Sequence, residues 1–137
     1  MNVNETIRHC QSLSFYALQD FVGHNYITAY DHYKNVTNPD RACRLLKEVI
    51  YLAIASDGML YESEWKFIAS FVGGISYDEA MAECSNVLSE KNKQALRDII
   101  RNAPRNVGEA LISMCIGVLC TDGRVEGEEV NFLRSLL

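Results

Sequence analysis

The sequence lacks most of the features that interrupt or staple a chain. Only two prolines occur in 137 residues, and the five cysteines include no C-x-x-C pair. The chain does not open with the charged and apolar segments of a signal peptide. Long helices are therefore permitted, and reduced thiols in a cytoplasmic protein are the simplest account of the cysteines. Cys43, Cys115 and Cys120 lie in apolar segments and are predicted to be small core residues.

Positive charge is also scarce. The chain has 13 Lys and Arg against 18 Asp and Glu, for a net charge of −5. A nucleic-acid binder needs a basic face to neutralise phosphates, and an anionic membrane surface attracts basic segments. The longest run without charge, from Ala110 up to Asp122, is shorter than the ~20 apolar residues of a membrane span. We therefore expect a soluble protein that binds neither nucleic acid nor membrane.

Apolar residues recur at helical spacing along the whole chain, and no segment alternates as a strand does. Helix-start signals stand at Asn2, Asn38, Ser76, Ser89 and Asn106, each followed by an acid or a proline in the first turn. Pro104 would close the helix that starts at Ser89. The prediction is an all-α, single-domain bundle of about seven helices over residues 1–137. The expected helices span residues 4–22, 25–35, 39–56, 62–72, 77–88, 90–103, 106–121 and 127 to the end, with the first two separated, if at all, at Gly23.

Two of these helices are apolar on nearly every face. The segments 39–56 and 106–121 carry Leu, Ile, Val, Met, Cys and Ala at almost all positions of their second halves. A helix that is apolar all round is buried rather than lying on a surface. These two helices are therefore predicted to be central, with the others packed around them.

The most informative feature is a motif that follows each of these two helices. Residues 57–68 read DGMLYESEWKFI, and residues 122–133 read DGRVEGEEVNFL. Asp, Gly, Glu and Phe recur in register, at a constant offset. The match predicts an internal pseudo-twofold repeat of helix–Asp-Gly turn–helix hairpins, over residues 39–72 and 106–137.

Each hairpin would carry carboxylates at its turn, which we call the first elbow (residues 57–64) and the second elbow (residues 122–129). Glycine supplies the positive backbone angle that ends a helix. Glu64 and Glu129 then fall in the first turn of the next helix, where free N–H groups and the helix dipole favour a carboxylate. The phenylalanine three residues further on is expected to face inward.

A buried helix that ends in Asp-Gly-x-apolar-x-x-x-Glu, followed by a short amphipathic helix and repeated once, is similar to the tellurite-resistance TerB family. The resemblance covers residues 39–137, and the N-terminal third matches only in being helical. It implies an all-helical, pseudo-symmetric domain of bacterial stress responses whose elbow carboxylates bind a divalent metal. Carried onto this sequence, the ligands would be Asp57, Glu64, Asp122 and Glu129.

Two interpretations of the elbow carboxylates stay open. As ligands, hard oxygen donors would favour Ca²⁺ or Mg²⁺ over zinc. As structural residues, the aspartates would form turns and the glutamates would occupy helix starts. An EF-hand is excluded, because the positions two and four residues before each aspartate hold Ala, Cys or Val instead of oxygen donors. Tyr61-Glu62 and Glu126-Gly127 also replace the family's serine and proline, which weakens the capping of the second helix.

No other constellation predicts catalysis or metal binding. The sequence has no G-x-S-x-G, no phosphate-binding glycine loop and no H-E-x-x-H motif. The histidines His9, His24 and His32 have no ligand spacing and are expected at the surface or in packing. A basic stripe at four-residue spacing is either a solvated face or a dock for an acidic partner or anion. Its members are Arg97, Arg101 and Arg105.

The N-terminal third offers a candidate binding surface. Residues 15–33 include six aromatic side chains, and Tyr26, Tyr30 and Tyr33 share one helical face, which predicts a packing face or a groove for a partner helix. The sequence favours a non-enzymatic binding or adaptor domain with a protein partner, cation-dependent if the elbows bind metal. One alternative is a structural or interaction scaffold that uses the aromatic face. Another is a metal-dependent enzyme that uses the elbow carboxylates, for which no His, Lys or nucleophile gives support.

Overall fold

A computed structural model of the chain describes residues 1–54, 61–72, 75–87, 90–122 and 127–136. These residues form a single all-α domain with eight α-helices, one 3₁₀ turn and no strand among them, which confirms the predicted fold class. The elements are α1 (Val3–Gln11), α2 (Phe15–Val36), α3 (Pro39–Ile54), α4 (Glu62–Val72), α5 (Tyr77–Val87), α6 (Glu90–Asn102), α7 (Arg105–Leu119), the 3₁₀ turn η2 (Cys120–Asp122) and α8 (Gly127–Ser135).

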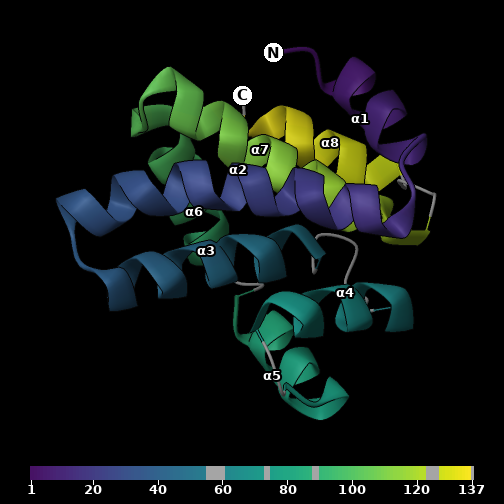
Figure 1. Cartoon of the computed structure of the whole chain (residues 1–137). Helices are drawn as coiled ribbons and strands as arrows, with labels where there is room; N and C mark the ends of the chain where they lie inside the picture. The colour runs from purple at the N-terminus through teal and green to yellow at the C-terminus, as the bar shows by residue number, and fades with distance from the viewer. Residues whose placement is uncertain (55–60, 73–74, 88–89, 123–126, 137) are drawn as a thin grey trace.

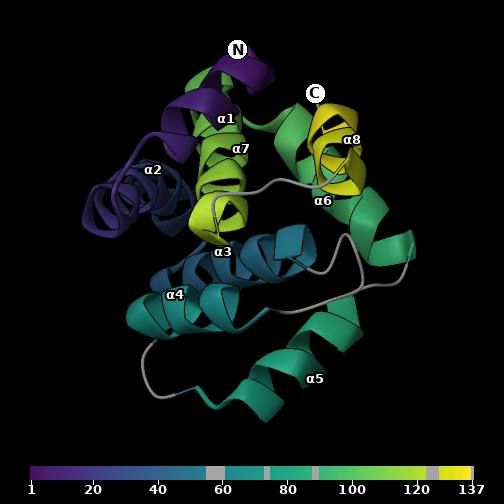
Figure 2. The ribbon, with the colours of Figure 1, turned by 90° about the vertical axis from the view of Figure 1, so that its right-hand side faces the viewer.

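Helix α7 is central, as predicted, but its main partner is α2 and not the second predicted central helix, α3. Among the described residues, α2 and α7 share the most extensive contact between two helices, and each also packs against α3. Helix α7 further contacts α1, α4, α6 and α8. Figure 1 shows α2 running across the front of α7 with α3 beneath it. Helices α4 and α5 lie on the lower side and α1 and α8 on the upper side, as the turned view confirms (Figure 2).

Burial follows the apolar pattern, with one correction. Helix α7 is buried almost continuously from Val107 to Leu119, as expected for a helix that is apolar all round. Helix α3 is buried on every side only from Val49 to Ile54. Its first half is amphipathic, and Cys43 is exposed there, so its prediction as a core residue is wrong. Two arginines flank this cysteine on the solvent side, and the continuous apolar run begins only after them.

Glycine permits a close approach at two positions on α7. A Cβ atom on Gly117 would overlap Cγ2 of Val22, which is fully buried on α2, and would lie 3.3 Å from Cδ1 of Phe21. A Cβ on Gly108 would lie 3.2 Å from the carbonyl oxygen of Ile100 on α6. The missing side chains therefore set how closely α2 and α6 pack against α7.

Three of the predicted helix caps are confirmed. Asn2, Asn38 and Ser76 each accept the N–H of the residue three positions later through a side-chain oxygen, at 3.1, 2.9 and 3.1 Å. Each of these bonds satisfies an N–H group that has no partner within the helix. The predicted cap at Ser89 lies outside the described residues.

Two predicted boundaries are wrong. The break in the N-terminal segment falls at residues 12–14, where Ser14 accepts the N–H of Ala17 at 3.2 Å and starts α2, whereas Gly23 lies inside that helix. Packing on α3 and α7 stabilises the long helix through its glycine. Asn106 is no cap, because α7 already begins at Arg105 after Pro104, whose ring fixes the backbone angle before the helix.

Candidate functional site

The structure describes the side chain of one of the four predicted metal ligands. Asp57 lies outside the described residues. Asp122 ends η2 and Glu129 is the third residue of α8, but their side chains are not among those described. Glu64 is the third residue of α4, in the first turn as predicted. The phenylalanine that follows it, Phe67, is fully buried as expected, and its counterpart in the second motif is outside the described side chains.

Glu64 is buried, with only 4% of its surface exposed. Its Oε1 accepts the N–H of Tyr61, the residue before α4, at 3.0 Å. This bond is one half of a capping box, in which the glutamate of the first turn reaches back to the helix start. The described contact is therefore the one that the structural interpretation of the elbows requires.

Glu64 lies near side chains of α5 and affects their electrostatics. Burial raises the pKa of the Cys84 thiol to about 12, and the negative charges of Glu64 and Glu83 add to the shift. Burial likewise raises the pKa of Tyr51 on α3 to about 12, with smaller contributions from acids and Cys84 of α5. The region between α3, α4 and α5 thus disfavours further negative charge.

Helical elements that adjoin the two elbows are in contact. Helix α4, which carries Glu64, packs against η2, the turn that ends in Asp122. In Figure 2 α4 lies below the lower end of α7, with α3 between them in this view. Within the residues that the structure describes, no group of three His, Cys, Asp or Glu side chains is placed to hold a metal ion. Three of the four predicted ligands are outside that set, so Ca²⁺ or Mg²⁺ binding and the pseudo-twofold repeat stay predictions.

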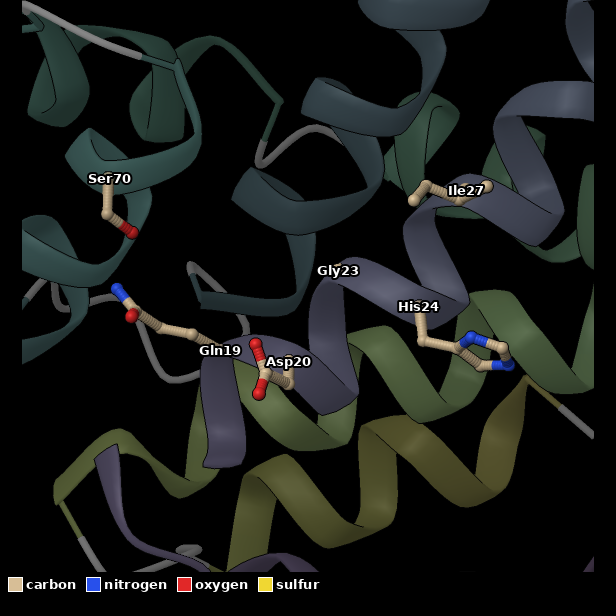
Figure 3. A pocket seen from close by; sticks show the side chains of 6 residues that line it. All are labelled: Gln19, Asp20, Gly23, His24, Ile27 and Ser70. Carbon is tan, nitrogen blue, oxygen red and sulfur yellow. The ribbon is translucent and has the colours of Figure 1, made fainter. Parts of the chain in front are cut away.

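A groove of about 530 Å³ lies between α2 and α4. Five of its lining residues come from one face of α2, and one comes from α4 (Figure 3). The lining residues are Gln19, Asp20, Gly23, His24, Ile27 and Ser70. The side chains of Gln19 and Ser70 point towards each other, and the imidazole of His24 is turned away from them (Figure 3).

Large apolar side chains stand exposed along this face of α2. Tyr16 is 77% exposed and Ile27 is 59% exposed. Together with Asp20 and Gly23 they follow one another at spacings of four, three and four residues, so they form a single stripe along the helix. The exposed ring of Phe15 packs edge-on against the buried ring of Phe67, with centroids 5.8 Å apart. The stripe thus begins where α2 meets α4.

The predicted tyrosine face of α2 is a packing face. Tyr26, Tyr30 and Tyr33 are half-buried against the core, and the first two rings stack at 6.1 Å. The Lys34 ammonium lies 5.6 Å from the centre of the Tyr30 ring, a cation–π contact. The exposed part of the aromatic segment is instead its start, at Phe15 and Tyr16. The predicted surface was defined by aromatic residues and so did not include Ile27, although its helical spacing from Tyr16 can be seen in the sequence.

The remaining candidates are mostly engaged locally. His9 and His32 make edge-on ring contacts with Phe21 and Tyr33, at 5.7 and 4.9 Å, in agreement with packing roles. In the basic stripe, Arg105 pairs with Glu109 at 3.3 Å. Its other members are Arg97, whose Nε donates to Ser135 at 3.4 Å, and Arg101, which lines a separate cleft beside Arg105. None of the helices in the described ranges is long and apolar enough to cross a membrane.

No family model, curated protein or solved structure matches the chain. The resemblance to the TerB family therefore stays a prediction based on the two Asp-Gly motifs.

Proposed function

We propose that this protein is a non-enzymatic binding module that holds an amphipathic helix of a protein partner in the groove between α2 and α4. The observation that carries the proposal is the exposed stripe on α2: Ile27 lines the groove, and Tyr16 lies exposed on the same face, one turn before the first lining residues. An amphipathic helix places its apolar face in such a groove and anchors it at positions three, four and seven residues apart. Gly23 has no side chain and leaves the middle of the stripe open to close approach.

The groove also indicates the chemistry of the partner. Asp20 lies in the middle of the stripe, is exposed, and has no ion pair among the described residues. A partner helix that carries a Lys or Arg opposite Asp20, between two apolar anchors, complements this pattern. The net charge of −5 favours the approach of a basic segment. Tyr16 and Ile27 are eleven residues apart, so the partner helix needs a length of about 16 Å, or roughly three turns.

The fold suits an adaptor role. The inner face of α2 is fixed by its interface with α7, and binding sites on rigid helices are positioned more accurately than sites on loops. The TerB resemblance implies a domain of bacterial stress responses, in which an adaptor role would be in place. The groove belongs to the N-terminal third, where the resemblance supplies no site, so this part of the proposal depends on the geometry alone.

Photo-crosslinking in cells tests the proposal. A photo-reactive residue at position 27 is expected to give one discrete adduct with another protein, because Ile27 would lie against the partner helix. Val36 is the matched control, since it is 61% exposed on the same helix. It lies nine residues after Ile27, which places it on the opposite side of α2 from the groove. We expect no such adduct from position 36. Equal adduct patterns from the two positions would contradict the proposal.

A second candidate function, divalent-cation binding at the elbows, is favoured by the contact between α4 and η2. That contact brings the helix with Glu64 next to the turn with Asp122, and the four predicted ligands are all carboxylates, which suit Ca²⁺ or Mg²⁺. The capping bond of Glu64 to Tyr61 uses Oε1, so the carboxylate would have to bind a cation while it caps the helix.

Thermal unfolding of chelator-treated protein separates cation binding from the structural interpretation. If the elbows bind, Ca²⁺ or Mg²⁺ at 100 times its Kd stabilises the native state by about 2.7 kcal/mol and raises the unfolding midpoint. Asp57→Asn and Asp122→Asn are expected to abolish the shift. An unchanged midpoint at millimolar metal in the wild type would leave these residues as turn and helix-start residues.

A further inference from the structure

A second cleft, separate from the groove on α2, lies where the end of α6 meets the start of α7. Its volume is about 360 Å³, and none of its lining residues belongs to the groove. Ile100, Ile112 and Leu136 line this cleft and are at most 6% exposed, so they form an apolar floor. The volume is near the lower end of the range for small-molecule pockets, which suits a compact ligand with an apolar part.

Two arginines and one glutamate line the same cleft. The Nε of Arg105 lies 3.3 Å from Oε1 of Glu109, one helical turn later, so the charges of this pair largely cancel. The same oxygen of Glu109 lies 3.7 Å from the nitrogen of Met1. Arg101 is exposed and has no ion pair within the part of the chain that the structure describes. The cleft therefore combines an unpaired positive charge with an apolar floor.

We propose that this cleft binds a small organic carboxylate, a molecule with one carboxylate group and a compact apolar body. The guanidinium of Arg101 donates to the carboxylate, and the apolar body lies on the floor of the cleft. A planar guanidinium matches a carboxylate and pairs with it through two parallel N–H···O bonds. One unpaired cation balances the single charge of a carboxylate better than the double charge of a phosphate. Removal of the apolar body from water supplies the rest of the affinity.

Glu109 limits how tightly such a ligand binds. Its carboxylate neutralises Arg105 and places a negative charge beside that of the ligand. Glu109→Gln removes this charge and frees Arg105 for the ligand, so the variant is expected to bind several-fold more tightly. Arg101→Gln is expected to bind about tenfold more weakly, the effect of losing one charge-assisted hydrogen bond. A purely structural role of these side chains would not change the affinity in opposite directions.

Titration of the ¹⁵N-labelled protein with hexanoate at neutral pH, followed by its amide chemical shifts, tests the proposal. We expect saturable shifts at Ala103 and Gly108, which line the cleft. Hexanol has the same apolar chain without the charge, and hexylamine carries the opposite charge, so both are expected to bind about tenfold more weakly or less. Arg44→Gln is the matched control, because Arg44 is exposed on α3 and does not line the cleft. This variant is expected to bind hexanoate as the wild type does.

Three results would overturn the proposal. The first is the absence of saturable shifts at the cleft with hexanoate. The second is equal affinity for hexanoate and hexanol, because the arginine would then take no part in binding. The third is an equal loss of hexanoate binding in Arg101→Gln and Arg44→Gln, since the effect would then come from the overall charge of the protein. The groove between α2 and α4 has other lining residues, so these results leave the proposed function untouched.

Discussion

Gly117→Ala is expected to lower the free energy of unfolding by about 1–3 kcal/mol, the usual range for an overpacked core. The added methyl would overlap Cγ2 of Val22 where α2 and α7 cross, the most extensive helix contact in the described part of the chain. Alanine alone would favour the helix over glycine by about 1 kcal/mol, so a net loss shows that the overlap decides the sign. Urea unfolding of the variant measures the change.

Two further variants control this experiment. Val22→Ala removes the atom that the new methyl meets, so the double variant is expected to be more stable than the sum of the two single effects predicts. Gly127→Ala adds a Cβ at the start of α8, where no atom lies within 4 Å, and is expected to change stability by less than about 1 kcal/mol. If Gly117→Ala and Gly127→Ala behave alike, the close approach of α2 and α7 is contradicted.

Phe67→Ala is expected to cost about 3–5 kcal/mol, as for other fully buried phenylalanines. Phe67 has no exposed surface and is part of the main core, so its removal leaves a cavity beneath α4. The matched control is Phe15→Ala. Phe15 touches Phe67 edge-on but is 48% exposed, so its loss is expected to destabilise the protein much less. Similar losses of stability from the two variants, measured by urea unfolding, would show that Phe67 does not anchor α4.

Local sequence signals predicted the helices well, because a helix start depends on a few neighbouring residues. The side-chain caps at Asn2, Asn38 and Ser76 are present where the sequence placed them. The wrong boundaries arose where tertiary contacts, or a residue with a stronger capping preference nearby, outweighed the predicted signal. Ser14, rather than Gly23, separates the first two helices, because a hydroxyl cap starts α2 there while packing against two neighbours stabilises the helix through its glycine.

Burial was predicted less well than secondary structure. Cys43 lies in the amphipathic first half of α3, before the continuously buried run from Val49 to Ile54, so its exposure depends on which side of α3 faces α2 and α7. That orientation is a property of the whole bundle and is not encoded in the local apolar fraction.

The candidate sites differ in how far the sequence reveals them. The stripe from Tyr16 to Ile27 follows helical spacing and can be predicted from the sequence once residues 15–36 are assigned to one helix. The packing of α1 against η2 depends on how α1 returns to the end of α7, which no local pattern specifies. The placement of Glu64 at a helix start was predicted, and its bond to Tyr61 supports the structural role of the elbow glutamate.

The central claim is that the groove between α2 and α4 binds a basic amphipathic helix of another protein. The most direct measurement is photo-crosslinking from position 27 in a cell extract, with an excess of unlabelled protein as competitor. We expect wild type and Val36→Asp to suppress the adduct while Ile27→Asp does not, because only the last change removes the apolar side chain that lines the groove. Equal suppression by all three competitors, or no adduct from position 27, would contradict it.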